Sequence, residues 1–73
     1  MTRDTSSFCL VGRLLYGAAW RGQLSHELNI NPRTVARMAK GEHPIPPTLW
    51  DDLQKACYSR AFLLGSLAKR IAT

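Results

Sequence analysis

Residues 21–41, RGQLSHELNINPRTVARMAKG, decide the fold, because they carry the marks of two short helices joined by a sharp turn. The second helix begins behind Asn31, a good N-cap, with Pro32 at the first helical position, where its missing N–H would have no partner anyway. It ends at Gly41, a common helix stop, with Lys40 in the last turn, where the helix dipole favours a cation. We therefore predict a second helix of about nine residues.

This second helix has two chemically different sides. At about 100° per residue, Arg33, Arg37 and Lys40 share one narrow arc of the helix. Val35 and Met38 lie on the other side. The pattern predicts one face that packs into a core and one face that contacts an anion.

The preceding helix supplies a matching apolar set. Leu24 and Leu28 form an i, i+4 pair, and Ile30 adds a third apolar group in the turn. Asn29, which lies between them, tolerates the left-handed backbone that a tight turn between crossed helices needs. This spacing predicts helix-turn-helix geometry.

The string LSHELNINPRTVARMAKG, residues 24–41, resembles the helix-turn-helix of the Cro and phage-repressor (XRE-type) families. The longer run LLYGAAWRGQLSHELNINPRTVARMAKGEHPIP, residues 14–46, is similar to small repressors of phages and mobile elements, a group that includes anti-CRISPR-associated repressors. Two residues depart from the family pattern: Ser25 replaces the usual alanine and Asn29 the usual glycine, and both are small or compatible with a turn. The resemblance implies a transcriptional repressor that binds double-stranded DNA as a dimer.

On this interpretation the second helix lies in the major groove of DNA. We expect Arg33 and Arg37 to read bases through paired hydrogen bonds to guanine, and Thr34 to reach a thymine methyl group or a phosphate. Contacts to the DNA backbone are expected from polar residues in and around the motif, namely Arg13, Arg21, Gln23, Asn31, Lys40 and His43.

The charge of the chain also favours an anionic partner. The 73 residues carry a net charge of +5, and the sequence pI is near 9.9. Between positions 13 and 40, the arginine and lysine residues are opposed by Glu27 alone. Nucleic acid is the commonest partner of such a concentration of positive charge, and a solvated basic face is the alternative.

The length predicts a single domain, which we assign to residues 1–73. At this size only about 60% of the unfolded chain's surface can be buried, so a monomer would have low stability. We expect an all-α fold of four to five helices, with the helix-turn-helix at its centre and a long or broken helix at the C-terminus. We also expect this fold to form a homodimer.

The first helix is predicted from its cap, its apolar spacing and its stop. Ser6 or Ser7 is expected to cap it, and Gly17 to end it. Its apolar positions form two adjacent i, i+4 rows that we expect in the core, Leu10 with Leu14 and Val11 with Leu15. Trp20 is expected to anchor the start of the next helix by packing on this first one.

The C-terminal part begins with a rigid connector, EHPIPP at residues 42–47, in which Ile45 is a predicted plug into the core. Apolar residues then recur at spacings of three and four as far as Ile71, which allows one long helix or two helices broken near residues 58–59. The apolar arc is too wide for a small four-helix protein to cover on both sides, so segment 48–73 is predicted to form a dimer interface. The residues expected in that interface are Trp50, Ala61, Phe62, Leu64, Gly65, Leu67, Ala68 and Ile71.

The sequence lacks the patterns of an enzyme, since it has no nucleophile–base pair, no paired carboxylates at a useful spacing, no phosphate loop and no metal cluster. HELNI at residues 26–30 lacks the second histidine of the HExxH metal motif. We therefore expect no catalysis, metal or cofactor and, with no room for a separate sensing domain, no small-molecule effector. The alternative to a DNA-binding repressor is a protein-interaction module, such as an antitoxin or adaptor, that binds its partner through the apolar C-terminal stripe.

The compartment is predicted from cysteine usage and from the absence of long apolar runs. Cys9 and Cys57 have no CxxC or metal spacing, which favours buried free thiols in a reducing cytoplasm. Asp4 and Arg13 interrupt the pattern of a secretory signal, and no run of about twenty apolar residues exists elsewhere. We expect a cytoplasmic protein with no membrane association.

Overall fold

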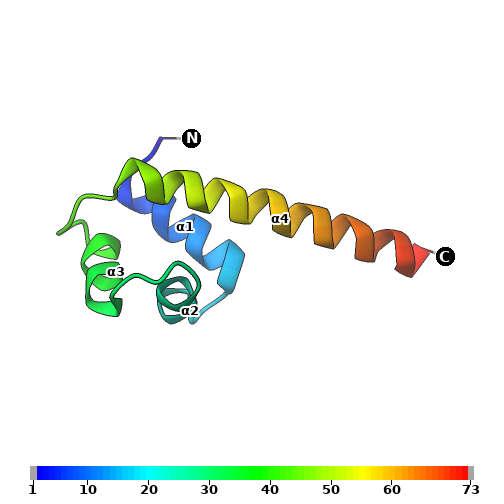
Figure 1. Ribbon diagram of the computed structural model, residues 1–73, viewed down its shortest axis with the longest axis horizontal. Coiled ribbons are helices and arrows are strands. Elements are labelled where there is room, and N and C mark those ends of the chain that lie inside the picture. The colour runs from blue at the N-terminus through cyan, green and yellow to red at the C-terminus, as the bar shows by residue number, and fades with distance from the viewer. Residues whose placement is uncertain (1, 73) are drawn as a thin grey trace.

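A computed structural model describes residues 2–72, and in this part of the chain the fold is all-helical. The helices are α1 (Thr5–Tyr16), α2 (Trp20–Glu27), α3 (Pro32–Ala39) and α4 (Pro47–Ala72). Helices α1, α2 and α3 pack on one another, α1 also packs along the first half of α4, and the rest of α4 projects away from them (Figure 1). The molecule is therefore elongated, with extents of 47 × 23 × 18 Å.

Helix α1 is capped one turn earlier than its serines suggest. The N-cap is Asp4, whose carboxylate accepts the N–H of Ser7 at 2.8 Å, so the expected cap at Ser6 or Ser7 is wrong. The backbone and side-chain hydrogen bonds from Ser7 stabilise the charged carboxylate and lower the pKa of Asp4. The predicted stop at Gly17 is confirmed, because its φ of 82° lies in the left-handed region that favours glycine.

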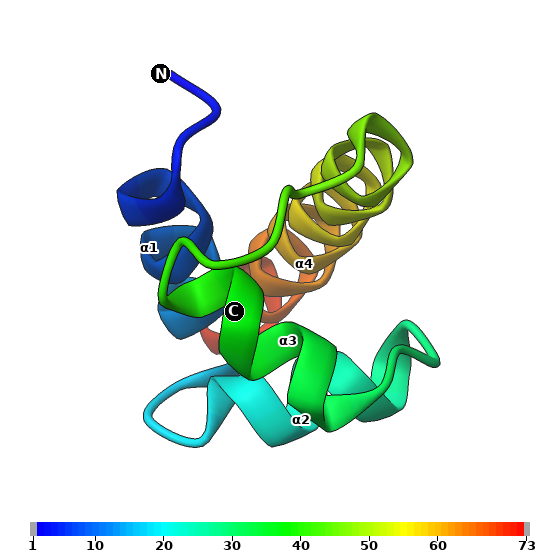
Figure 2. The ribbon, with the colours of Figure 1, turned by 90° about the vertical axis from the view of Figure 1, so that its left-hand side faces the viewer.

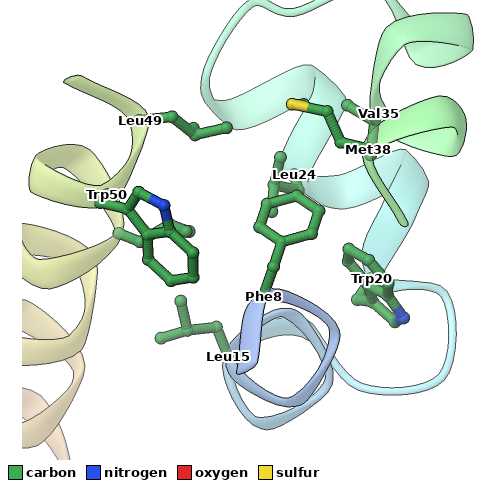
Figure 3. Close-up of a cluster of buried hydrophobic side chains, with 9 residues drawn as sticks. Phe8, Leu15, Trp20, Leu24, Val35, Met38, Leu49 and Trp50 are labelled. Atoms are coloured by element: carbon green, nitrogen blue, oxygen red, sulfur yellow. The ribbon is translucent and has the colours of Figure 1, made fainter. Parts of the chain in front are cut away.

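The core is centred on an aromatic group from three helices. Phe8 of α1 lies between Trp20 of α2 and Trp50 of α4 (Figure 3), with ring centroids 5.5 and 6.2 Å away and both pairs edge to face. This geometry places the positive edge of one ring against the negative face of the next. The aliphatic residues that complete the core are Leu15, Leu24, Val35, Met38, Leu49 and Leu53.

The buried face of α1 differs from the predicted one. Phe8, Gly12 and Leu15 face the core, and the Trp20 ring packs so closely on Gly12 that a Cβ there would overlap it. A position two residues from Phe8 or Gly12 lies about 200° around the helix. Leu14 is therefore 77% exposed and Leu10 is also exposed, and the expectation that their row is buried is wrong.

The turn between α2 and α3 is held by polar groups as well as by its apolar residues. Asn29 has a φ of 54°, as its place in a tight turn predicts. The buried hydroxyl of Ser25 donates to the carbonyl of Ile30 at 2.6 Å, and the Ile30 N–H donates to the Ser25 carbonyl at 3.0 Å. Serine at position 25 therefore ties the end of α2 to the turn. The arrangement is compatible with a helix-turn-helix.

The predicted boundaries of α3 are confirmed to within a residue. The Asn31 side-chain oxygen accepts the N–H of Arg33 at 2.8 Å, and Pro32 is the first helical residue. After the helix, Gly41 has a φ of 79°, which allows the chain to turn away at once. Both ends of this short helix are thus set by local chemistry.

Helix α4 runs without a break from Pro47 to Ala72, a length of 26 residues, so the sequence alternative of two helices is excluded. Its first turns bury Leu49 and Leu53 in the core, and Ile45 in the preceding connector is half-buried against the same cluster, as predicted. Beyond Leu53 no described residue of α4 is fully buried. The second half of α4 is therefore a helix without a partner in this chain.

The sequence pattern predicts Trp50 in a dimer interface, but the structure places its side chain in the chain's own core. Its side chain is 8% exposed and packs on Phe8 inside the chain's own core, while the Arg3 guanidinium lies 5.9 Å from the centroid of its ring. The apolar stripe that contains Trp50 is wide enough to serve both purposes. Trp50 is buried in the chain's own core because Phe8 packs edge to face against its ring.

Candidate nucleic-acid interface

The exposed side of α3 carries the three cations that the sequence places on one arc. Arg33, Arg37 and Lys40 are exposed, whereas Val35 and Met38 on the opposite side are buried. In the described part of the chain, no salt bridge joins any of these three cations to a carboxylate. Because the buried side anchors α3 to the core, the cations are held on a fixed outer face.

This face lies at one end of the molecule. In Figure 2, α3 faces the viewer with α2 beneath it, while α4 recedes behind. Figure 1 shows the same relationship from the side, with the free end of α4 at the far end of the long axis from α3. The basic face of α3 and the projecting half of α4 are thus well separated, and each can contact a different partner.

Thr34 lies at the edge of the basic face. Its side chain is half-buried and lines a narrow groove between α3 and the start of α4, together with Met38 and His43. The helical angle explains this position, because Thr34 is about 100° from Arg33 and closer to the buried Met38. Its hydroxyl and methyl groups are therefore available only toward the α4 side of the face.

The N-terminus of α2 is open. Ala19 occupies the N-cap position and no side chain accepts a hydrogen bond from the first amides of the helix. Gln23 is exposed, and the guanidinium group of Arg21 lies 5.3 Å from the centroid of the Trp20 ring. A Cβ added to Gly22 would meet nothing within 4 Å. The end of α2 therefore offers unpaired backbone amides beside one cation, a combination that favours an anion.

Asn31 and His43 keep only part of their hydrogen-bonding capacity. The side-chain oxygen of Asn31 is used in capping α3, which leaves its NH₂ group for other contacts. The Nδ1 atom of His43 lies 2.7 Å from the carbonyl oxygen of Pro44. Because a carbonyl only accepts, Nδ1 carries the proton, and Nε2 is the nitrogen left for a partner.

Arg13 is the one predicted DNA contact that stands apart from the others. It is exposed in the last turn of α1. Figure 1 places that end of α1 beyond α2, on the side away from α3. The structure thus brings together most of the predicted residues on α3 and at the start of α2 but does not bring Arg13 to the same face.

The residues predicted in the dimer interface lie on the projecting half of α4, with Trp50 excepted. They are exposed, and they comprise Ala61, Phe62, Leu64, Gly65, Leu67, Ala68 and Ile71. The sequence prediction misses exposed Leu14 of α1, which lines an open apolar groove with Cys57 and Leu64 of α4. Gly12 is the signal that could have revealed it, since a glycine inside a helix next to aromatic residues indicates a close contact on that side.

Tyr16 of α1 connects three helices near the point where α4 leaves the core. Burial raises the pKa of its hydroxyl, and the nearby Glu27 carboxylate acts in the same direction. The Arg60 guanidinium lies 5.7 Å from the centroid of its ring and opposes the shift. This contact places the guanidinium of Arg60, which is an exposed residue, over an aromatic ring of its own chain.

Other kinds of site find little support in residues 2–72. Within them, no three His, Cys, Asp or Glu residues are grouped so that they could hold a metal ion. Cys9 is half-buried and its thiol donates to the Ala39 carbonyl at 3.5 Å, but Cys57 is exposed, so the expectation of two buried thiols is wrong for Cys57. None of the described helices combines the length and the apolar character needed to cross a bilayer.

Comparisons with protein-family models, with curated proteins and with solved structures found no match to this chain.

Proposed function

We propose that this protein is a sequence-specific regulator of transcription, of the phage-repressor type, that binds double-stranded DNA as a homodimer. The observation that carries the proposal is the outer face of α3. Arg33, Arg37 and Lys40 are exposed on this face, and the turn from α2 fixes the start of the helix that carries them. An anion-binding face on a short anchored helix is what major-groove recognition requires. The resemblance of residues 24–41 to repressor motifs supports the same conclusion.

The dimensions of α3 suit the proposed role. An eight-residue helix is about 12 Å long, and the major groove of B-DNA is about 12 Å wide. Arg33 in the first turn and Arg37 in the next would present their guanidinium groups to base edges. Each group can form two parallel hydrogen bonds to guanine, so these arginines are the proposed base readers, with Thr34 reaching the flank of the same groove.

Backbone contacts would fix the register of α3 on the DNA. The open N-terminus of α2, with Arg21 and Gln23 beside it, would receive one phosphate. Lys40, the NH₂ group of Asn31 and His43 would contact others around α3. Arg13 would contact DNA only if the DNA extended beyond α2, so we do not include it among the main backbone contacts.

The proposed regulatory mode is repression. A small protein bound across a promoter blocks access to the DNA without any further activity, and in this chain response to the protein's own concentration would suffice. A two-fold dimer would bind an inverted repeat whose half-site centres are about 10 bp apart or a multiple of one helical turn. We propose that its own promoter carries such a repeat.

The experiment that tests this function is selection from a library of random DNA duplexes. The purified protein should enrich an inverted repeat, and fluorescence anisotropy should then show tighter binding to the selected duplex than to a scrambled one of equal length and composition. Enrichment of no common sequence, with equal affinity for both duplexes, would contradict sequence-specific binding.

One observation favours a second candidate, a protein-interaction module such as an antitoxin or adaptor. The projecting half of α4 exposes large apolar side chains that another protein could cover. On that alternative, DNA binding would be weak and indifferent to sequence, and the protein would associate with its partner through α4. The anisotropy comparison described above separates the two candidates.

A further inference from the structure

The projecting half of α4 has a continuous apolar arc. At about 100° per residue, its members fall on one side of the helix, and they are Cys57, Ala61, Leu64, Leu67, Ala68, Ile71 and Ala72. Ser59, Ser66 and Lys69 lie on the opposite side, and Gly65 lies at the edge of the arc beside Ala72. The exposed side chains of Tyr58, Phe62 and Leu63 lie outside the arc. We call the first set the apolar arc of α4. Its large members, Leu64, Leu67 and Ile71, are between 50% and 86% exposed.

The apolar arc continues the line of residues that α4 buries in the core. Leu53, which is buried, and Ile71, which is exposed, lie on the same side of the helix because eighteen residues complete about five turns. Where the two regions meet, Leu14 of α1 and Cys57, Ala61 and Leu64 of α4 line an open and mostly apolar groove, and Arg60 is the one charged residue in its lining. The core of the chain therefore ends in a groove that opens onto an uncovered apolar helix.

We propose that a second copy of this chain covers the apolar arc, with the two α4 helices antiparallel about a two-fold axis near Gly65. In this register, Leu64 lies opposite Gly65 of the partner subunit and Ala61 lies opposite Ala68 of the partner subunit. Cys57 then lies opposite Ala72 of the partner subunit. The last two turns of each α4 thereby enter the apolar groove of the other copy, and each Leu14 becomes covered.

The amount of exposed apolar surface fits one subunit of a stable dimer. The arc of α4, with Leu14 of α1, leaves large side chains between 50% and 86% exposed. At roughly 100–150 Å² for each exposed leucine or isoleucine, and with the smaller residues between them, this approaches the 800 Å² or so that each partner contributes to a standard interface. A contact of this size needs no other protein to explain it.

The distribution of charge favours the second copy and the antiparallel direction. Arg60, the one cation at the arc, is stacked on Tyr16 of its own chain, and Lys69 faces away from the arc. No acidic residue follows Asp52 in the sequence, so a parallel pair would bring the basic ends of both helices together. An antiparallel pair separates them and places the two helix dipoles antiparallel, so that the positive end of each lies beside the negative end of the other.

The small residues of the arc allow the two helices to approach closely. Ala61 and Ala68 are seven residues apart, so they recur on the same side of α4 after two turns. A Cβ added to Gly65 would meet nothing within 4 Å in the single chain, which leaves that point of the helix open. Leu64, Leu67 and Ile71 would flank this contact and exclude water from it.

This pairing rests on the proposed dimeric DNA binding for its role in the cell, but its geometry is tested without DNA. Sedimentation equilibrium at micromolar concentration should give a dimer for the unmodified protein and for Ser66→Glu, which adds charge on the side away from the arc. Leu64→Glu and Leu14→Glu should each weaken self-association about a hundredfold or more, because each buries a charge in the contact. Trp20 and Trp50 fluorescence should report an unchanged core in both variants.

The register is tested by disulfide formation under mild oxidation in a Cys9→Ala background. Ala72→Cys should give a covalent dimer through Cys57, and Lys69→Cys, on the opposite side of the helix, should not. In the proposed register the two native Cys57 residues are about 22 Å apart along the axis and should not cross-link. A monomeric unmodified protein, or cross-linking of Cys57 to Cys57, would overturn the inference. A dimer that cross-links as expected but binds no DNA would support the antiparallel pairing and contradict the proposed function.

Discussion

The indole ring of Trp20 packs directly on the backbone of Gly12, and the absence of a side chain at position 12 is what lets α2 approach α1. The contact also orients α1, because it turns Phe8 and Leu15 inward. An alternative residue at position 12 would have to push Trp20 away from Phe8, with which it forms an edge-to-face pair. One glycine thus fixes the relative position of two helices.

Replacement of Gly12 by alanine should lower the free energy of unfolding by about 1–3 kcal/mol, because the added methyl group overlaps a ring that has no room to move. Gly22→Ala is the matched control, since nothing lies within 4 Å of its Cβ and alanine is the better helix former by about 1 kcal/mol. Urea denaturation should therefore show opposite signs for the two substitutions. Equal stabilisation by both would contradict the Gly12–Trp20 contact.

The turn residue Asn29 should respond to substitution according to its backbone angle. With φ at 54°, Asn29→Gly should leave stability unchanged or raise it, whereas Asn29→Val should destabilise the protein by about 1–3 kcal/mol, because a β-branched residue is strained there. Thermal unfolding followed by circular dichroism measures both. A tolerated valine would mean that the turn adopts another conformation.

The base-reading role of Arg37 should appear as lost discrimination. Arg37→Ala should reduce the preference for the selected duplex over its scrambled counterpart by about 1–3 kcal/mol, the value of one good paired contact to guanine. Arg33→Ala should behave in the same way, and Lys40→Ala should weaken binding to both duplexes alike. Lys69→Ala, near the far end of α4, serves as the control for a simple loss of charge. If neither arginine substitution alters the preference, the assigned roles are wrong.

The salt dependence of DNA binding should be steep. If the dimer neutralises about six or more phosphates, its affinity should fall about a thousandfold or more between roughly 50 and 200 mM salt, because condensed counterions are released. Anisotropy titrations over that range give the slope, and Arg21→Ala should reduce the slope by about one phosphate per subunit, which is about two for the dimer. A nearly flat dependence would favour the protein-interaction alternative.

Acid should weaken the cap of α1 through Asp4. The pKa of this carboxyl is lower in the folded chain than the ordinary value of 3.8, because the Ser7 hydrogen bonds stabilise the charged form. The stabilisation of the folded chain by the charged Asp4 carboxylate is therefore complete above the pKa that Asp4 has in the unfolded chain. It is lost as the pH falls through the lower pKa of the folded chain. Asp4→Asn, which still offers an oxygen to the Ser7 N–H, should lack this pH-dependent component. Chemical denaturation between pH 2 and pH 6 compares the two proteins, and identical pH profiles would argue against the cap.

Local chemistry in the sequence determined the α2–α3 region. Asn31, Pro32 and Gly41 mark the ends of α3, and Asn29 marks the turn, because caps and left-handed residues act within a few positions of themselves. The exposed arc of Arg33, Arg37 and Lys40 follows from helical geometry once the buried side is known. The all-helical class and the basic face of α3 were therefore predictable without coordinates.

Tertiary structure decided which apolar positions are buried. Leu14 and Leu10 have the spacing of core residues, but the contact of Trp20 with Gly12 turns them outward. Trp50 has the spacing of an interface residue, but Phe8 draws it into the core. Periodicity identifies an apolar side of a helix, whereas burial depends on whether another segment of the chain reaches that side. Helix α1, which packs along α4, ends near Arg60, whereas the apolar arc continues to Ala72, and only the folded chain shows that difference in length.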